Sequence, residues 1–124
     1  MNALRVISFD IDGTLEEVGQ PPGIVSVALV RRAKHLGYLV GSCSDRPISY
    51  QQQIWERLRI AVDFTVLKHR LDDVKARFPA AAYYHIGDTD IDDYFATASG
   101  FRFLRAEPVA HRSWVAELFA EPSA

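Results

Sequence analysis

Two acidic residues follow the first apolar run of the chain, in the segment DIDGTL at positions 10–15. On an extended backbone, residues two positions apart project toward the same side, so the carboxylates of Asp10 and Asp12 would lie close together. Such a pair attracts a divalent cation, or each carboxylate shifts the pKa of the other. Gly13 lets the chain turn sharply away from the strand. Taken alone, the segment is equally compatible with a polar loop after a strand.

A second polar group follows the next apolar run, where Ser44 and Asp45 precede Pro47. Proline is common in the first turn of a helix, so a helix is expected to begin here. Ser44 offers a hydroxyl and a backbone N–H, and the first N–H groups of the helix could bind an anion. Ser44 or Asp45 could also simply cap the helix, and capping does not exclude anion binding.

Lys68 follows the third apolar run, and the segment GDTDIDD at positions 87–93 follows the fourth. A lysine in this place is by itself more typical of a solvated surface. The second segment holds four acids in six residues, at positions 88, 90, 92 and 93. These carboxylates would repel one another unless a cation or a helix N-terminus compensates their charge. At least one of them should therefore do more than cap the following helix.

The hydrophobic pattern predicts the elements that would position these groups. Short apolar runs predict strands at 5–11, 38–42, 64–67, 83–86 and 101–104, and helical spacing predicts a helix after each strand. This alternation predicts an α/β fold, a Rossmann-like three-layer α/β/α sandwich with a mostly parallel five-stranded sheet. Such sheets bind ligands beyond the carboxyl ends of their strands, which is where each of the polar groups lies.

Composition narrows the class of protein. The 124 residues, with 48% hydrophobic and 24% charged side chains, predict a single domain over residues 1–124. A net charge of -2 disfavours a nucleic-acid partner. The single cysteine, Cys43, cannot form an internal disulfide, which suits the cytosol. No apolar run approaches the ~20 residues of a membrane span. We therefore expect a cytoplasmic protein that does not act at membranes.

In order, the four polar groups resemble the motifs of the haloacid dehalogenase (HAD) superfamily of phosphotransferases. The first motif of that superfamily, D-x-D-G-T-[LV], matches positions 10–15 throughout, and the resemblance extends over residues 6–104. The second motif is a Ser or Thr, the third a Lys and the fourth an acidic G-D-x-x-x-D. They are matched by Ser44, by Lys68 (with Lys75 as a weaker option), and by Gly87, Asp88 and Asp92.

The resemblance implies a Mg²⁺-dependent hydrolase of phosphomonoesters that works through an aspartyl-phosphate. Asp10 would be the nucleophile, and Asp12 the general acid and base, an acid that family members doing dehalogenation lack. Ser44 and Lys68 would hold the phosphoryl oxygens. Further substrate contacts would come from Gly13, Thr14, Asp45 and Arg46. The metal would be held by the carboxylates of Asp10 and Asp88, the backbone carbonyl of Asp12, and Asp92 directly or through water.

The spacing of the motifs leaves no room for the cap domain that many HAD enzymes carry. A helix and a strand take up more than half of the 30 residues from 14 to 43, and the gap between Ser44 and Lys68 holds one helix and one strand. Capless relatives often act on macromolecules or use neighbouring subunits to cover the site. The phosphorylated substrate could thus be a small molecule or a macromolecule, and a homo-oligomer is compatible with the sequence.

Two other functions remain as alternatives. A phospho-receiver signalling domain has a similar length and clustered acids, but it expects its acceptor Asp after the third strand and its Lys after the fifth. Here Lys68 follows the third strand and the fifth ends in LRA at 104–106, which is the wrong order. A catalytically weak HAD-like binding module is the other alternative, and the presence of every motif residue counts against it.

Several residues beside the motifs have simpler interpretations. Arg46, His69 and Arg70 could form a basic rim for the leaving group of a substrate, or a solvated edge. His85 lies within the fourth strand and is predicted to be a core histidine with satisfied hydrogen bonds. Cys43 alternates with the serines on either side of it and is predicted to pack against a helix.

Overall fold

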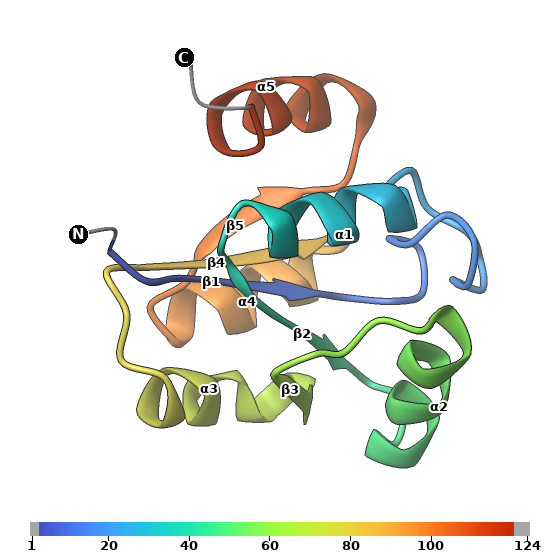
Figure 1. Cartoon of the computed structure of the whole chain (residues 1–124), viewed down its shortest axis with the longest axis horizontal. Helices are drawn as coiled ribbons and strands as arrows, with labels where there is room; N and C mark the ends of the chain where they lie inside the picture. The colour runs from blue at the N-terminus through green and yellow to red at the C-terminus, as the bar shows by residue number, and fades with distance from the viewer. Residues whose placement is uncertain (1–2, 121–124) are drawn as a thin grey trace.

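Five short strands form one parallel sheet in the computed structural model of the chain, which describes residues 3–120 (Figure 1). The strand order is β3-β2-β1-β4-β5, and every neighbouring pair is parallel. The strands are β1 (Arg5–Phe9), β2 (Leu39–Ser44), β3 (Phe64–Leu67), β4 (Ala82–Gly87) and β5 (Arg102–Arg105). The predicted fold class, a Rossmann-like α/β sandwich, is confirmed.

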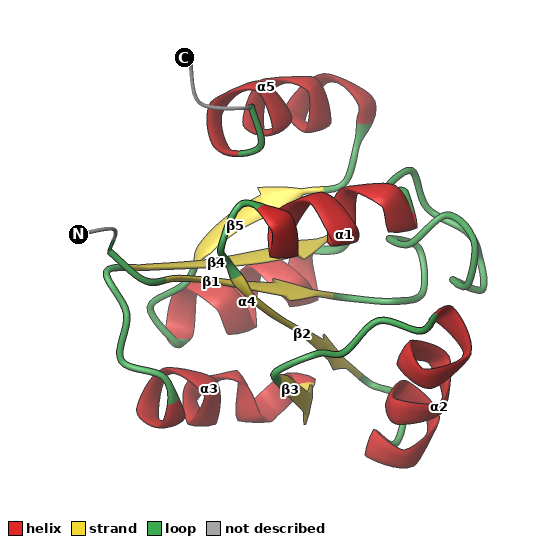
Figure 2. Ribbon diagram, in the orientation of Figure 1, coloured by secondary structure: helices red, strands yellow, loops and turns green. Residues whose placement is uncertain are grey.

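Helices cover both faces of the sheet (Figure 2). They are α1 (Val27–His35), α2 (Ile48–Leu58), α3 (Leu71–Arg77), α4 (Asp90–Ala98) and α5 (Pro108–Leu118), with a 3₁₀ turn, η1 (Lys68–Arg70), before α3. Buried side chains of α1, α2 and α5 share one core with Ile7 and Phe9 of β1. Those of α3 and α4 share a second core with Val6, because successive strand residues face opposite sides. Within residues 3–120, no helix is both long enough and apolar enough to cross a bilayer.

The strand order places a crevice between β1 and β4. From β1 the chain moves to β2 and β3 on one side, and β4 and β5 lie on the other side. The carboxyl ends of β1 and β4 therefore flank a topological switch point, where doubly wound sheets bind their ligands. The order also differs from the 2-1-3-4-5 order of receiver domains, which removes support from the signalling alternative.

The first strand is shorter than the sequence pattern predicts. β1 ends at Phe9 instead of reaching Ile11. A side-chain oxygen of Asp10 accepts a hydrogen bond from the N–H of Ile11 at 2.8 Å, and Gly13 adopts a left-handed φ of 74°. The chain thus turns away from β1 after Asp10, whose backbone N–H still donates to the carbonyl of Ile86 at 2.9 Å.

Helix α4 buries a different face from the one its apolar spacing suggests. Ile91 and Tyr94 are 58% and 67% exposed, whereas Asp92 and Ala96 are fully buried. The hydrogen bonds of Asp92 within the protein compensate the cost of burying its charge. A buried polar network therefore sets the rotation of α4.

Candidate functional site

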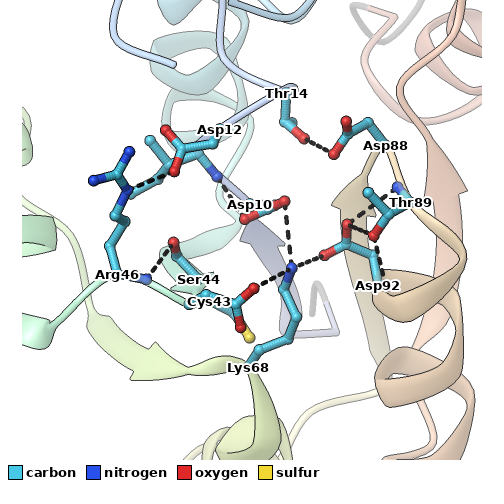
Figure 3. A network of polar contacts seen from close by, with 12 residues as sticks. Asp10, Asp12, Thr14, Cys43, Ser44, Arg46, Lys68, Asp88, Thr89 and Asp92 are labelled. Atoms are coloured by element: carbon cyan, nitrogen blue, oxygen red, sulfur yellow. Dashed lines mark hydrogen bonds and ion pairs between the residues drawn. The ribbon is translucent and has the colours of Figure 1, made fainter. Parts of the chain in front are cut away.

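A cavity of about 240 Å³ opens at the carboxyl ends of the strands. Residues from all four predicted motifs line it, and Figure 3 shows them converging from separate elements. The lining residues are Asp10, Asp12, Gly13, Pro21, Ser44, Asp45, Lys68, Asp88 and Thr89. Residues 78 positions apart in the chain, such as Asp10 and Asp88, thus share one site.

The loop after β1 packs tightly against the segment that follows β4. At Gly13, a Cβ atom would clash with Oδ2 of Asp88, so any side chain there would displace this carboxylate. Thr14 is buried, and its hydroxyl donates to Oδ1 of Asp88 at 3.4 Å. Thr14, predicted as a substrate contact, instead supports Asp88 and does not line the cavity.

Lys68 carries the positive charge of the cavity. The 3₁₀ turn η1 buries this residue, and Nζ lies 3.2 Å from Asp92, 3.5 Å from Asp45 and 3.7 Å from Asp10. Burial lowers the pKa of Lys68, but the three carboxylates outweigh it and raise the pKa. Lys68 therefore remains an ammonium group. Lys75, the weaker option in the sequence, lies over the Tyr83 ring instead and does not line the cavity.

Asp92 is fully buried, and both of its carboxylate oxygens have protein partners. Oδ1 contacts Nε2 of His85 at 3.0 Å and Nζ of Lys68 at 3.2 Å. Oδ2 accepts from the N–H and the hydroxyl of Thr89 at 3.2 and 2.8 Å. Burial alone would raise the pKa of Asp92, but the contacts with His85 and Lys68 lower it. Asp92 thus stays ionised and holds Lys68 in place.

His85 is a core histidine with both ring nitrogens hydrogen-bonded, as predicted. Nδ1 lies 2.9 Å from the hydroxyl of Ser8, and Nε2 contacts Asp92. Cys43 is also buried as predicted, and burial raises the pKa of its thiol.

Gln51 supports the site in a way that the sequence did not reveal. It belongs to the apolar stripe of α2 and is fully buried. Oε1 accepts from the hydroxyl of Ser42 at 2.7 Å, and Nε2 donates to the carbonyls of Arg46 and Val66 at 2.9 and 3.1 Å. Gln51 thereby joins the end of β2 to β3. The one feature of the sequence that could have revealed this role is the presence of a glutamine among the apolar residues of a helical stripe.

Ser44 and Asp12 lie on the remaining side of the cavity. The hydroxyl oxygen of Ser44 accepts from the N–H of Arg46 at 3.0 Å, which leaves the hydroxyl proton available to a ligand. Oδ2 of Asp12 accepts from Nε of Arg46 at 2.6 Å, and Oδ1 accepts from the N–H of Gln20 at 3.0 Å. This hydrogen bond with Asp12 raises the pKa of Arg46.

The other charged residues around the cavity are more exposed. Asp45 approaches Lys68, but its side chain is 81% exposed. Arg70 forms an ion pair with Asp73 at 2.8 Å, and His69 does not line the cavity. Of the three residues of the proposed basic rim, Arg46 forms an ion pair with Asp12, which lines the site.

Three carboxylates could hold a metal ion. One oxygen from each of Asp10, Asp88 and Asp92 lies within 4.8 Å of the others. An all-oxygen set suits a hard cation such as Mg²⁺. Burial first, and then the charge of Asp92, raise the pKa of Asp10 to about 8 despite Lys68. A cation bound beside Asp10 would favour its ionised form. Because the oxygens of Asp92 are already engaged, Asp10 and Asp88 fit direct coordination best.

The raised pKa of Asp10 predicts a pH-dependent stability. An unfolded Asp has a pKa near ~4, so between there and about 8 the folded chain keeps a proton that the unfolded chain releases. Folding stability therefore falls as pH rises through this window, and Asp10→Asn removes that loss. In EDTA, we expect the free energy of unfolding of Asp10→Asn, measured relative to wild type, to increase by up to ~1.4 kcal/mol for each unit that the pH rises within this window. Urea titrations across the window test this, with Asp72→Asn at an exposed position as control. A pH-independent difference would contradict it.

The acidic cluster also predicts stabilisation by Mg²⁺. A ligand at about a hundred times its Kd stabilises a folded protein by ~2.7 kcal/mol, which raises Tm by several degrees. Asp88→Asn should lose most of this increase, because it removes a carboxylate whose Oδ2 has no hydrogen-bond partner within residues 3–120. Asp93→Asn is the control, since Asp93 bonds Thr97 outside the cluster. Equal shifts in both variants, measured by thermal unfolding with and without Mg²⁺, would exclude Asp88 as a ligand.

No model of a known protein family matches the chain, and no curated protein matches it significantly.

Proposed function

We propose that the chain is a Mg²⁺-dependent phosphomonoesterase of the HAD type, with Asp10 as its nucleophile. The observation that carries this proposal is the convergence of Asp10, Asp12, Ser44 and Lys68 on one cavity beside an acidic cluster. Asp10 and Asp12 follow β1, Ser44 ends β2 and Lys68 follows β3, so these side chains meet only when the chain folds. Their chemistry fits one reaction, the transfer of a phosphoryl group to a carboxylate and then to water.

In this proposal, Asp10 attacks phosphorus. Its Oδ1 is fixed by the N–H of Ile11, which leaves Oδ2 toward Lys68 and the cavity. A carboxylate must be ionised to act as a nucleophile, and repulsion between it and a phosphate dianion must be relieved. When bound at Asp10 and Asp88, Mg²⁺ would supply the positive charge that meets both needs.

In this proposal, Lys68 and Ser44 hold the oxygens of the transferring group. The ammonium of Lys68 is positioned by Asp92 and Asp45, so little reorganisation is needed when charge develops on the phosphoryl oxygens. The hydroxyl of Ser44 supplies a hydrogen-bond donor from the end of β2.

Asp12 serves both halves of the reaction. In the first, Oδ2 of Asp10 bonds to phosphorus, the ester P–O bond breaks, and Asp12 gives its proton to the leaving oxygen. In the second, Asp12 takes a proton from water, the water oxygen bonds to phosphorus, and the bond to Asp10 breaks. The contacts from Arg46 and Gln20 hold the Asp12 carboxylate at the rim of the cavity.

The absence of an inserted domain supports an open site. Residues 10–26 connect β1 to α1 as a loop, and residues 45–63 hold α2 between β2 and β3. No cap therefore lies between the motifs within residues 3–120. Water has access to such a site, which favours hydrolysis over transfer to another acceptor.

Hydrolysis of p-nitrophenyl phosphate tests the proposal. We expect release of nitrophenol that requires Mg²⁺ and stops with EDTA. A panel of phosphorylated metabolites then extends the assay to natural leaving groups. A folded protein that binds Mg²⁺ yet hydrolyses none of these esters would overturn the proposal and favour the binding-module alternative.

A further inference from the structure

A second cavity, of about 440 Å³, adjoins the candidate active site. It is lined by Gln20, Arg46, Tyr50, Gln53, Ile54 and Arg57. The Asp12–Arg46 ion pair, 2.6 Å long, separates the two cavities: Asp12 lines the first and Arg46 lines the second. Gln20, which also lines the second, donates its N–H to Asp12. Figure 3 shows the guanidinium of Arg46 beyond Asp12, on the side away from Lys68.

Positive charge dominates this second cavity, because none of its lining residues is acidic. Arg57 forms no ion pair or hydrogen bond within residues 3–120. Arg46 engages Asp12 through Nε alone, and its two terminal nitrogens have no hydrogen-bond partner in the described part of the chain. Two guanidinium groups thus offer unused donors to whatever occupies the cavity.

The cavity also has an ordered apolar side. The guanidinium carbon of Arg46 lies 4.9 Å from the centre of the half-buried Tyr50 ring, in a cation–π contact. Ile54 also lines the cavity but is almost fully buried, so the Tyr50 ring is the main apolar side chain open to a ligand. Arg46 is therefore held between Tyr50 and Asp12 before any ligand binds. An organic group that carries an anion fits this combination of apolar and cationic surfaces.

On the basis of the proposed function, the reaction at the active site indicates which part of the substrate would occupy the second cavity. A general acid must contact the oxygen of the leaving group, so the remainder of that group lies on the Asp12 side of the phosphorus. We propose that the second cavity binds the leaving group of the substrate and selects esters whose leaving group carries its own anion. That anion is a carboxylate or a second phosphate, bound by Arg46 and Arg57.

We choose Arg57 for the test, because a substitution at Arg46 would also disturb Asp12, the proposed general acid. The probes are 4-carboxyphenyl phosphate, its uncharged carboxamide and 1,4-phenylene bisphosphate, with kcat/KM measured for each. We expect wild type to prefer at least one charged ester to the carboxamide, and Arg57→Gln to reduce that preference about tenfold, equivalent to ~1.4 kcal/mol. Arg112→Gln, at an exposed position on α5, should keep the wild-type ratio.

The charged ester with the larger preference identifies the anion as carboxylate or phosphate. Turnover of all three esters with no charge preference, or with a preference that Arg57→Gln leaves unchanged, would overturn this inference alone. If wild type hydrolyses none of the three, the proposed function fails and this inference fails with it.

Discussion

Asp10→Asn should abolish phosphatase turnover while the protein stays folded. We expect kcat for p-nitrophenyl phosphate to fall by at least ~10³-fold, because the amide cannot form the covalent intermediate. Asparagine has the size and shape of aspartate, and its carbonyl oxygen can still accept the hydrogen bond from Ile11. The metal-free variant should also be no less stable than wild type at about pH 8, because it removes a carboxylate whose pKa burial raises.

Circular dichroism and thermal unfolding of the same sample separate lost chemistry from lost structure. Asp72→Asn, on the exposed side of α3, is the control for an Asp-to-Asn substitution away from the site, and it should retain wild-type activity. Activity of Asp10→Asn within tenfold of wild type would rule out attack by Asp10.

Asp12→Asn should cause a loss whose size depends on the leaving group. For an alkyl phosphate, whose leaving oxygen needs a proton, we expect kcat to fall by ~10²–10⁴-fold. Nitrophenolate leaves without a proton, so the first step with p-nitrophenyl phosphate should be affected much less. The second step still needs Asp12 to remove a proton from water. Rapid mixing should therefore show a burst of nitrophenol followed by slow steady release.

Glu16→Gln provides the matched control for Asp12, because Glu16 is an exposed acid in the same loop. It should leave both phases at the wild-type rate. Equal losses for alkyl and nitrophenyl esters in Asp12→Asn, with no burst, would argue against a general-acid role for Asp12.

The sequence predicts the five strands and the polar side chains near their ends from local periodicity, although the first two strands end two residues away from the predicted positions. The run at 64–67 places Lys68 directly after β3, whereas the apolar pattern extends the first strand to residue 11 and so misses its end at Phe9. In a parallel sheet these ends must meet at one edge. Lys68, which matches the third motif better than Lys75 because it directly follows a strand, lines the cavity.

Contacts between distant elements are not encoded in such local patterns. The hydrogen bond between Ser8 and His85 depends on the register of β1 against β4, which sets these two residues side by side. The rotation of α4 depends on His85, Lys68 and Thr89 drawing Asp92 inward, against the apolar spacing of Ile91 and Tyr94. The Arg46–Asp12 ion pair likewise joins two loops whose separation only the folded sheet fixes.

The location of the phosphoryl group during turnover tests the proposed mechanism most directly. Asp12→Asn mixed with Mg²⁺ and p-nitrophenyl phosphate, quenched in acid during the burst and reduced with borohydride, should yield homoserine at position 10 by peptide mass spectrometry. The double variant Asp10→Asn, Asp12→Asn should yield none. A nitrophenol burst without modification at position 10, or with the phosphoryl group on another residue, would contradict Asp10 as the nucleophile.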